Sequence, residues 1–227
     1  MFGHRSLPVP FVILTGCWSG ERVLVRLLAA GGTVRCSGRV LGTPHRRPAA
    51  HLRQVLRRAA HGDLAHGAVL HPTDLWLTND LDPAAFVRDL LADGVQTVVL
   101  SRRRHEDSGL SRVLCGRHGE LLPYRARFVD ADEVAVHADH GRLAKAWLDE
   151  VVPGALQTVF EDHLAHHEAR SATAARFMAS LNLPGWEPPA EPEPPTTEAL
   201  WRRVANPDLL RNGLEALGVP VPGGALR

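Results

Sequence analysis

The chain has 227 residues, of which 44% are hydrophobic and 22% are charged, so it holds enough apolar side chains for the core of one α/β domain. Lys and Arg number 26 against 25 Asp and Glu, and this near balance excludes the basic excess that is typical of nucleic-acid-binding proteins. The chain has three cysteines and no C-x-x-C pair, which disfavours a disulfide framework and a structural zinc site and favours a reducing cytoplasm.

The first predicted element is a strand over Phe11–Thr15, a short apolar run of the kind that is buried on both faces of a sheet. Residues 16–20 interrupt this run, and apolar residues at helical spacing then predict a helix over 21–30. Further strands are expected at 67–71, 96–101 and 156–160. Further helices are expected at 48–60, 82–91, 105–116, 139–151, 168–181, 196–204 and 207–217, with an irregular surface segment over 118–132.

Strands that alternate with helices predict a three-layer parallel sheet with helices on both faces. In such a sheet ligands bind at the carboxyl ends of the strands. The expected strands end at Thr15, His71, Ser101 and Phe160, and polar or charged residues lie at or directly after the first three of these ends. We therefore expect a functional site at this edge.

Residues 16–20, with the sequence Gly-Cys-Trp-Ser-Gly, connect the first strand to the first helix. Such a loop presents free backbone N–H groups and the positive end of the helix dipole, which together bind phosphate. The alternative is an ordinary turn that contains Gly and Ser. The ATP/GTP P-loop pattern fails because Glu21 and Arg22 stand in place of Lys and Ser. A small-molecule kinase is disfavoured as well, because the only lysine, Lys145, lies far along the chain.

Two more groups of residues follow expected strands. Arg103 comes just after the strand at 96–101, with Asp107 four positions later and Ser111 eight positions later. A guanidinium grips phosphate through two N–H groups, and a hydroxyl on the next helix would complete the cradle. The alternative is an exposed arginine-rich turn. His71 ends another strand, where an imidazole could take a proton from a hydroxyl or could simply end the strand.

The spacing of Arg103, Asp107 and Ser111 matches, residue for residue, the second nucleotide motif of the sulfotransferase family. In that family the Arg and the Ser hold the 3′-phosphate of 3′-phosphoadenosine-5′-phosphosulfate (PAPS). The segment at residues 18–24 resembles the family's first motif. The resemblance implies a P-loop-like sulfotransferase fold, PAPS as sulfuryl donor and no metal. It also implies a set of donor-binding residues, which are Trp18, Ser19, Gly20, Glu21, Arg22, Arg103 and Ser111.

His71 matches the histidine of a Gly-x-Lys-x-His run that bacterial sulfotransferases of the trehalose type often carry near the acceptor. The resemblance implies that His71 is the catalytic base. It also implies in-line transfer of a sulfuryl group to a hydroxyl of a small-molecule or natural-product acceptor. Weaker matches at residues 156–162, 176–181 and 203–206 extend the resemblance from Phe11 to Leu217.

The sequence departs from the family pattern at three places where the pattern has a cation or a hydroxyl. Trp18 replaces the loop's Lys or Arg, Val69 replaces the second-strand Lys, and Glu21 replaces a Ser or Thr. Arg39 stands where relatives often have Glu, so Glu21 and Arg39 could pair. The alternative function is therefore a non-catalytic protein of this fold that binds a nucleotide or another protein.

The remaining expectations concern organisation and partners. Residues 1–227 are predicted to form one sulfotransferase-like domain, with a Pro-rich arm over 184–195 and C-terminal helices over 196–217. No apolar run has the length of a membrane span, and the N-terminus lacks a signal-peptide pattern. We expect a cytoplasmic protein with a small-molecule acceptor, without nucleic-acid or membrane partners. A homodimer is compatible with the sequence.

Overall fold

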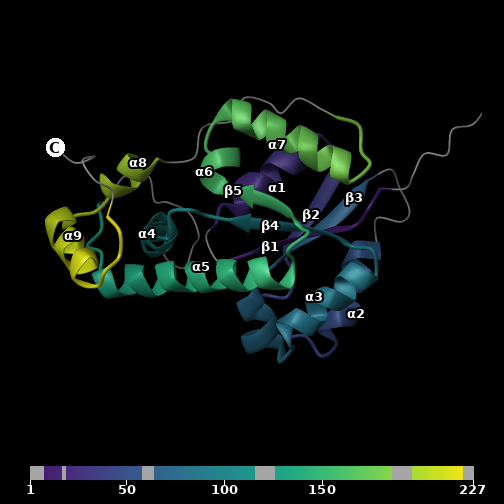
Figure 1. Cartoon of the computed structure of the whole chain (residues 1–227), viewed down its shortest axis with the longest axis horizontal. Helices are drawn as coiled ribbons and strands as arrows, with labels where there is room; N and C mark the ends of the chain where they lie inside the picture. The colour runs from purple at the N-terminus through teal and green to yellow at the C-terminus, as the bar shows by residue number, and fades with distance from the viewer. Residues whose placement is uncertain (1–7, 17–18, 58–63, 116–125, 186–195, 222–227) are drawn as a thin grey trace, which may run out of the picture.

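A computed structural model describes residues 8–16, 19–57, 64–115, 126–185 and 196–221. Its centre is a five-stranded sheet in the order β2-β3-β1-β4-β5, in which all neighbouring strands are parallel (Figure 1). The strands are β1 (Phe11–Thr15), β2 (Val34–Arg39), β3 (Ala65–Leu70), β4 (Gln96–Ser101) and β5 (Leu156–Val159).

Helices follow the strands along the chain and cover both faces of the sheet (Figure 1). They are α1 (Glu21–Ala29), α2 (Pro48–Arg57), the π-helix η2 (Asp74–Thr78), α3 (Pro83–Ala92), α4 (His105–Cys115), α5 (Ala131–Val151), α6 (Phe160–His163), α7 (His167–Ser180), α8 (Thr197–Trp201) and α9 (Pro207–Ala216). Within these described ranges, no helix is both long and apolar enough to cross a membrane.

Alternate side chains of β1 supply two separate apolar cores. Phe11 and Ile13 pack with buried residues of α1 and α7 on one face of the sheet. Val12 and Leu14 pack with residues of α2, η2, α3 and the second half of α5 on the other face. This alternation is what a strand covered on both sides produces. The fold is therefore the three-layer α/β arrangement that the sequence predicted.

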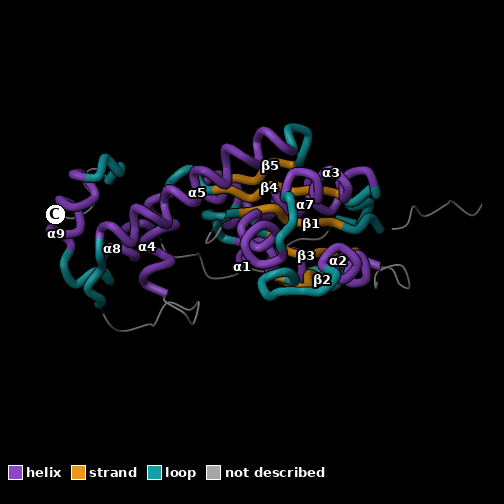
Figure 2. Tube along the Cα trace, turned by 90° about the horizontal axis from the view of Figure 1, so that it is seen from below, coloured by secondary structure: helices purple, strands orange, loops and turns teal. Residues whose placement is uncertain are grey.

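A third core lies beyond the carboxyl ends of the strands. It joins α4, α8 and α9 to the first half of α5, with Trp201 and Val134 among its buried side chains. Figure 2 shows these helices to one side of the sheet, reached by the long helix α5. Because α5 contributes Leu148 to the core on the sheet and Val134 to this one, it connects the two parts.

The structure differs from the sequence-based elements in the start of one helix and in three short elements. Helix α5 begins at Ala131 rather than residue 139, because the Asp130 carboxylate caps it by accepting the Asp132 N–H at 2.8 Å. Strand β2 and helices η2 and α6 were not predicted, and α6 begins at Phe160, where the sequence predicted the end of a strand. Most of the predicted Pro-rich arm, residues 186–195, lies outside the described residues.

Gly67 allows β3 to lie beside β1, because its register partner is Phe11. A Cβ at Gly67 would lie 2.2 Å from Cζ of Phe11, whose ring packs edge-on against Phe177. We expect Gly67→Ala to lower the free energy of unfolding by about 1–3 kcal/mol through overpacking. Urea denaturation measures this, with Gly154→Ala as control because the space around Gly154 is open. Equal stability of the two variants would contradict the packing described.

Candidate functional site

The buried polar residues of the sheet gather where the parallel strands end. Thr15, Ser101 and Thr158 are buried in or at the ends of β1, β4 and β5, and His71 and Arg102 follow directly after β3 and β4. Burying polar groups costs free energy, so a concentration of them at one edge of a sheet points to a functional surface. The candidate site therefore lies at the carboxyl edge of the sheet.

The loop between β1 and α1 is closed by its own hydroxyl groups. Thr15 Oγ1 and Ser19 Oγ both donate to the carbonyl oxygen of Gly16, at 2.9 and 3.0 Å. Gly20 caps α1 in a left-handed conformation with φ of 97°, which favours glycine. Glu21 and Arg22 then begin the helix. The predicted ligand Trp18 lies outside the described residues.

The ring of Phe160 connects this loop to the ends of β4 and β5. A Cβ at Gly20 would lie only 2.2 Å from Cδ2 of Phe160, so only a glycine fits there. The Arg102 guanidinium carbon lies 4.1 Å from the centroid of the same ring, in cation–π contact. Phe160 thus places Arg102 near the start of α1.

Arg102 is a cation that the sequence analysis did not select. Its residue is 8% exposed, and its Nε has no hydrogen-bond partner among the described residues. Burial lowers the pKa of Arg102, whereas the carboxylates of Glu161, Asp107 and Glu21 act to raise it. Because an arginine stays charged at neutral pH, this edge holds a buried positive charge with unused donor capacity.

Arg103, which was predicted to bind the 3′-phosphate, is exposed and forms an ion pair with Asp162. The backbone N–H groups of Arg103 and Arg104 both donate to the Glu161 carboxylate, at 2.9 and 3.2 Å. The start of α4 is therefore occupied by a carboxylate of the same chain. No hydrogen bond within the described ranges joins Arg103 to Ser111, which lies partly buried on α4.

Asp107 stabilises the same turn from inside the structure. Its Oδ2 accepts a hydrogen bond of 2.5 Å from Thr197 Oγ1, and that hydroxyl oxygen also accepts from Arg104 at 2.9 Å. Burial raises the pKa of Asp107, and the Thr197 hydrogen bond acts to lower it. Asp107 therefore holds α8 against α4 and serves as a structural residue here.

His71 is buried directly after β3, beside the ion pair of Arg39 and Asp74. Arg39 donates two hydrogen bonds to the Asp74 carboxylate, and the distance from Nε to Oδ2 is 2.6 Å. Burial, together with the Arg39 charge, lowers the pKa of His71 to about 4, while Asp74 acts in the opposite direction. The imidazole is therefore neutral at neutral pH, the form that can accept a proton.

The structure shows the surroundings of three residues that depart from the sulfotransferase pattern, which are Arg39, Glu21 and Val69. The carboxylate that binds Arg39 is Asp74, on η2, rather than Glu21. Burial raises the pKa of Glu21, and the nearby charges of Arg22, Arg39 and Arg102 only partly offset this. Val69 belongs to the apolar core under α1, so β3 brings no cation to that position.

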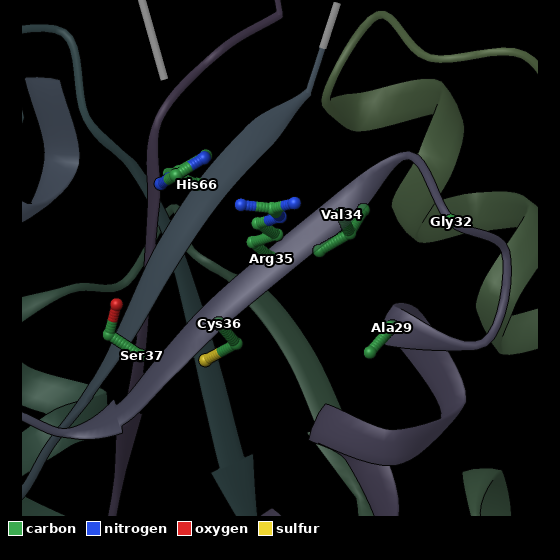
Figure 3. Close-up of a pocket in the computed structure, with 7 residues that line it drawn as sticks. All are labelled: Ala29, Gly32, Val34, Arg35, Cys36, Ser37 and His66. Carbon is green, nitrogen blue, oxygen red and sulfur yellow. The ribbon is translucent and has the colours of Figure 1, made fainter. Parts of the chain in front are cut away.

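A hollow of about 620 Å³ lies elsewhere, beside the edge strand β2 and the end of α1 (Figure 3). Its lining residues are Ala29, Gly32, Val34, Arg35, Cys36, Ser37 and His66, none of which was predicted to be functional. Among the described residues, no group of three or more His, Cys, Asp or Glu is placed to hold a metal ion. The candidate site therefore consists of residues at the carboxyl edge.

The fold is similar to that of a sulfotransferase from Alicyclobacillus acidocaldarius, known from a crystal structure. The two structures align with a TM-score of 0.51 over 96% of this chain and 99% of that one, at 16% sequence identity. No protein-family model matches the sequence. The search of curated proteins gave no match. The sulfotransferase-like α/β fold that the sequence predicted is thus confirmed.

The Arg39 charge should depress the pKa of His71. In Arg39→Met the Asp74 carboxylate stays and the cation is lost, so we expect the pKa of His71 to rise from about 4. NMR titration of the imidazole measures it. Arg53→Met is the control, because Arg53 pairs with Asp93 on the surface. A wild-type His71 that titrates near 6.5, or one that Arg39→Met leaves unchanged, would refute this account.

Proposed function

We propose that the protein transfers a sulfuryl group from PAPS to a hydroxyl of a small-molecule acceptor. The observation that carries this proposal is the buried Arg102, which lies beside the start of α1 in a sulfotransferase-like fold and whose Nε has no hydrogen-bond partner in the part of the chain that the structure describes. An anion at this edge would gain the Arg102 charge, the helix dipole and free N–H groups together.

In this proposal the loop of Ser19 to Arg22 binds the 5′-phosphosulfate. Arg102 supplies the positive charge that lysines supply in the family pattern and that this chain lacks at those positions. Negative charge moves to the leaving phosphate during transfer, so a fixed cation near that phosphate lowers the barrier. Arg102 is suited to this role because its guanidinium is already desolvated and held on the Phe160 ring.

His71 would act as the base. The acceptor oxygen forms a bond to sulfur, the bond from sulfur to the bridging phosphate oxygen breaks with its electron pair, and the acceptor proton moves to the imidazole. A pKa of about 4 is low for a base at neutral pH. A negatively charged donor bound at the same edge would raise it, because an anion favours the imidazolium form.

Arg103 and Ser111 would hold the 3′-phosphate, which requires Arg103 to exchange Asp162 for the nucleotide. This ion pair favours a second candidate function, that of a non-catalytic protein of the same fold. In that case the Glu161 and Asp162 carboxylates would permanently fill the place of the 3′-phosphate. The two functions differ in whether the nucleotide binds and whether an acceptor is then sulfated.

Calorimetric titration with 3′-phosphoadenosine-5′-phosphate tests the donor site. We expect binding by the wild type and at least a tenfold rise in Kd for Arg102→Met and for Arg103→Ala, because each loses a charge-assisted contact to phosphate. Arg88→Met is the control, since Arg88 is exposed on α3. Absence of wild-type binding would reject the donor site. Binding without turnover of any acceptor would favour the non-catalytic function.

Glu21 should make nucleotide binding depend on pH. Because burial raises its pKa, the Glu21 carboxyl group stays neutral to a higher pH than an exposed glutamate does, and it becomes a repulsive anion as the pH rises through that pKa. We therefore expect affinity to fall with rising pH in the wild type, and less steeply in Glu21→Gln. Because the phosphate of the ligand titrates in both experiments, the difference between the two profiles gives the contribution of Glu21 alone. Parallel profiles would exclude Glu21 from the site.

A further inference from the structure

A second hollow, of about 330 Å³, opens where the loop after β2 meets α2. Its lining residues are His45, Arg46, Arg47, Ala50, His51 and Gln54, none of which is acidic. The hollow therefore collects two guanidinium groups and two imidazoles over seven residues of sequence, in a chain whose net charge is only +1. A local excess of this kind attracts anions.

The two arginines of this hollow differ from their neighbours in their pairing. Arg39 is bound to Asp74 and Arg53 is bound to Asp93, each through a carboxylate of the same chain. Arg46 and Arg47 are exposed and form no ion pair with any described residue. Their guanidinium groups keep their paired N–H donors for a ligand, and such donors match the geometry of phosphate.

The two histidines of the hollow stack on each other, and hydrogen bonds fix the position of His45. The rings of His45 and His51 are stacked, with centroids 4.1 Å apart and planes 16° apart. His45 Nε2 lies 3.0 Å from the carbonyl oxygen of Val40, so that nitrogen carries the hydrogen and donates. The backbone N–H of His45 donates to Asn79 Oδ1 at 3.0 Å.

Asn79 connects this hollow to the surroundings of His71. Its Nδ2 donates to the carbonyl oxygens of Asp74 and Leu41, at 2.8 and 2.9 Å. Asp74 belongs to η2, the helix that follows His71, and η2 also exposes 65% of Trp76 and 71% of Leu77. The basic hollow and the predicted base therefore flank the same short helix, at the same edge of the sheet.

From this arrangement we infer that the hollow binds a phosphate-type oxyanion carried by the acceptor, with Arg46 and Arg47 as its ligands. The acceptor class is a phosphate monoester whose organic part lies over η2 and whose hydroxyl group is presented to His71. This inference rests on the proposed function. It adds a specificity site that is separate from the donor loop, because none of its residues belongs to the loop of Ser19 to Arg22.

The test is a titration of the whole protein followed through backbone amide resonances. The ligands are inorganic phosphate and phenyl phosphate, and the proteins are the wild type, Arg46→Ala/Arg47→Ala and the control Arg88→Ala. We expect saturable shifts over residues 45–54 with both ligands, a loss of affinity of at least tenfold in the double variant, and no loss in the control. Phenyl phosphate should also shift the amides of η2, whereas inorganic phosphate should not.

The outcomes separate this inference from the proposed function. Shifts confined to residues 19–24, or none at 45–54, would overturn the oxyanion site. Shifts at 45–54 with an unaffected η2 for both ligands would leave a site for free phosphate and overturn the acceptor class. The double variant should keep wild-type affinity for 3′-phosphoadenosine-5′-phosphate, so a failure of the acceptor site leaves the donor site standing, and the reverse also holds.

Discussion

The contact of Phe160 with Gly20 and Arg102 determines how the candidate site is arranged. It brings together the first turn of α1, the end of β4 and the start of α6, three segments that are distant in the sequence. A larger residue at position 20 would displace the ring, and without the ring the Arg102 side chain would lose the surface that supports it. A buried arginine needs such support, since burial removes most of its hydration.

The electrostatic consequence is that the buried cation Arg102 lies close to several carboxyl groups. Burial raises the pKa values of Glu21, Glu106 and Asp107, while the same burial lowers that of Arg102. Arg102 interacts electrostatically with each of these carboxyl groups, so an anion bound beside it would also raise their pKa values. Of the departures from the sulfotransferase pattern, Glu21 thus adds a carboxyl group with a raised pKa to this edge of the sheet.

The sequence was sufficient for the parts of the fold that carry strong periodic signals. The apolar runs of β1 and β4 and the glycine-bounded helix α1 were predicted to within a residue or two. Strand β2 was not predicted because it is an edge strand in which only Val34 is buried, so it has no apolar run in the sequence. Helix η2 was not predicted because a single π-helical turn is too short to show a periodic pattern of apolar residues.

The candidate site was less accessible to sequence reasoning for a geometric reason. Residues 102–104 are three consecutive arginines, and sequence cannot say which of them turns inward until the position of Phe160 is known. The family spacing selected Arg103, whereas the structure buries Arg102 and pairs Arg103 with Asp162. The basic residues of the α2 region were visible in the sequence, but the stack of His45 on His51 and the link through Asn79 depend on tertiary contacts.

The hydrogen bonds of Thr197 to Asp107 and Arg104 have a consequence for how the protein is made. They join the turn after β4 to a helix that begins about ninety residues later in the chain. During synthesis the sheet strands up to β5 emerge before α8, so β4 can pair with its neighbours while the turn that follows it still lacks this brace. The turn that holds Arg104 and Asp107 can therefore gain this brace only after Thr197 has left the ribosome.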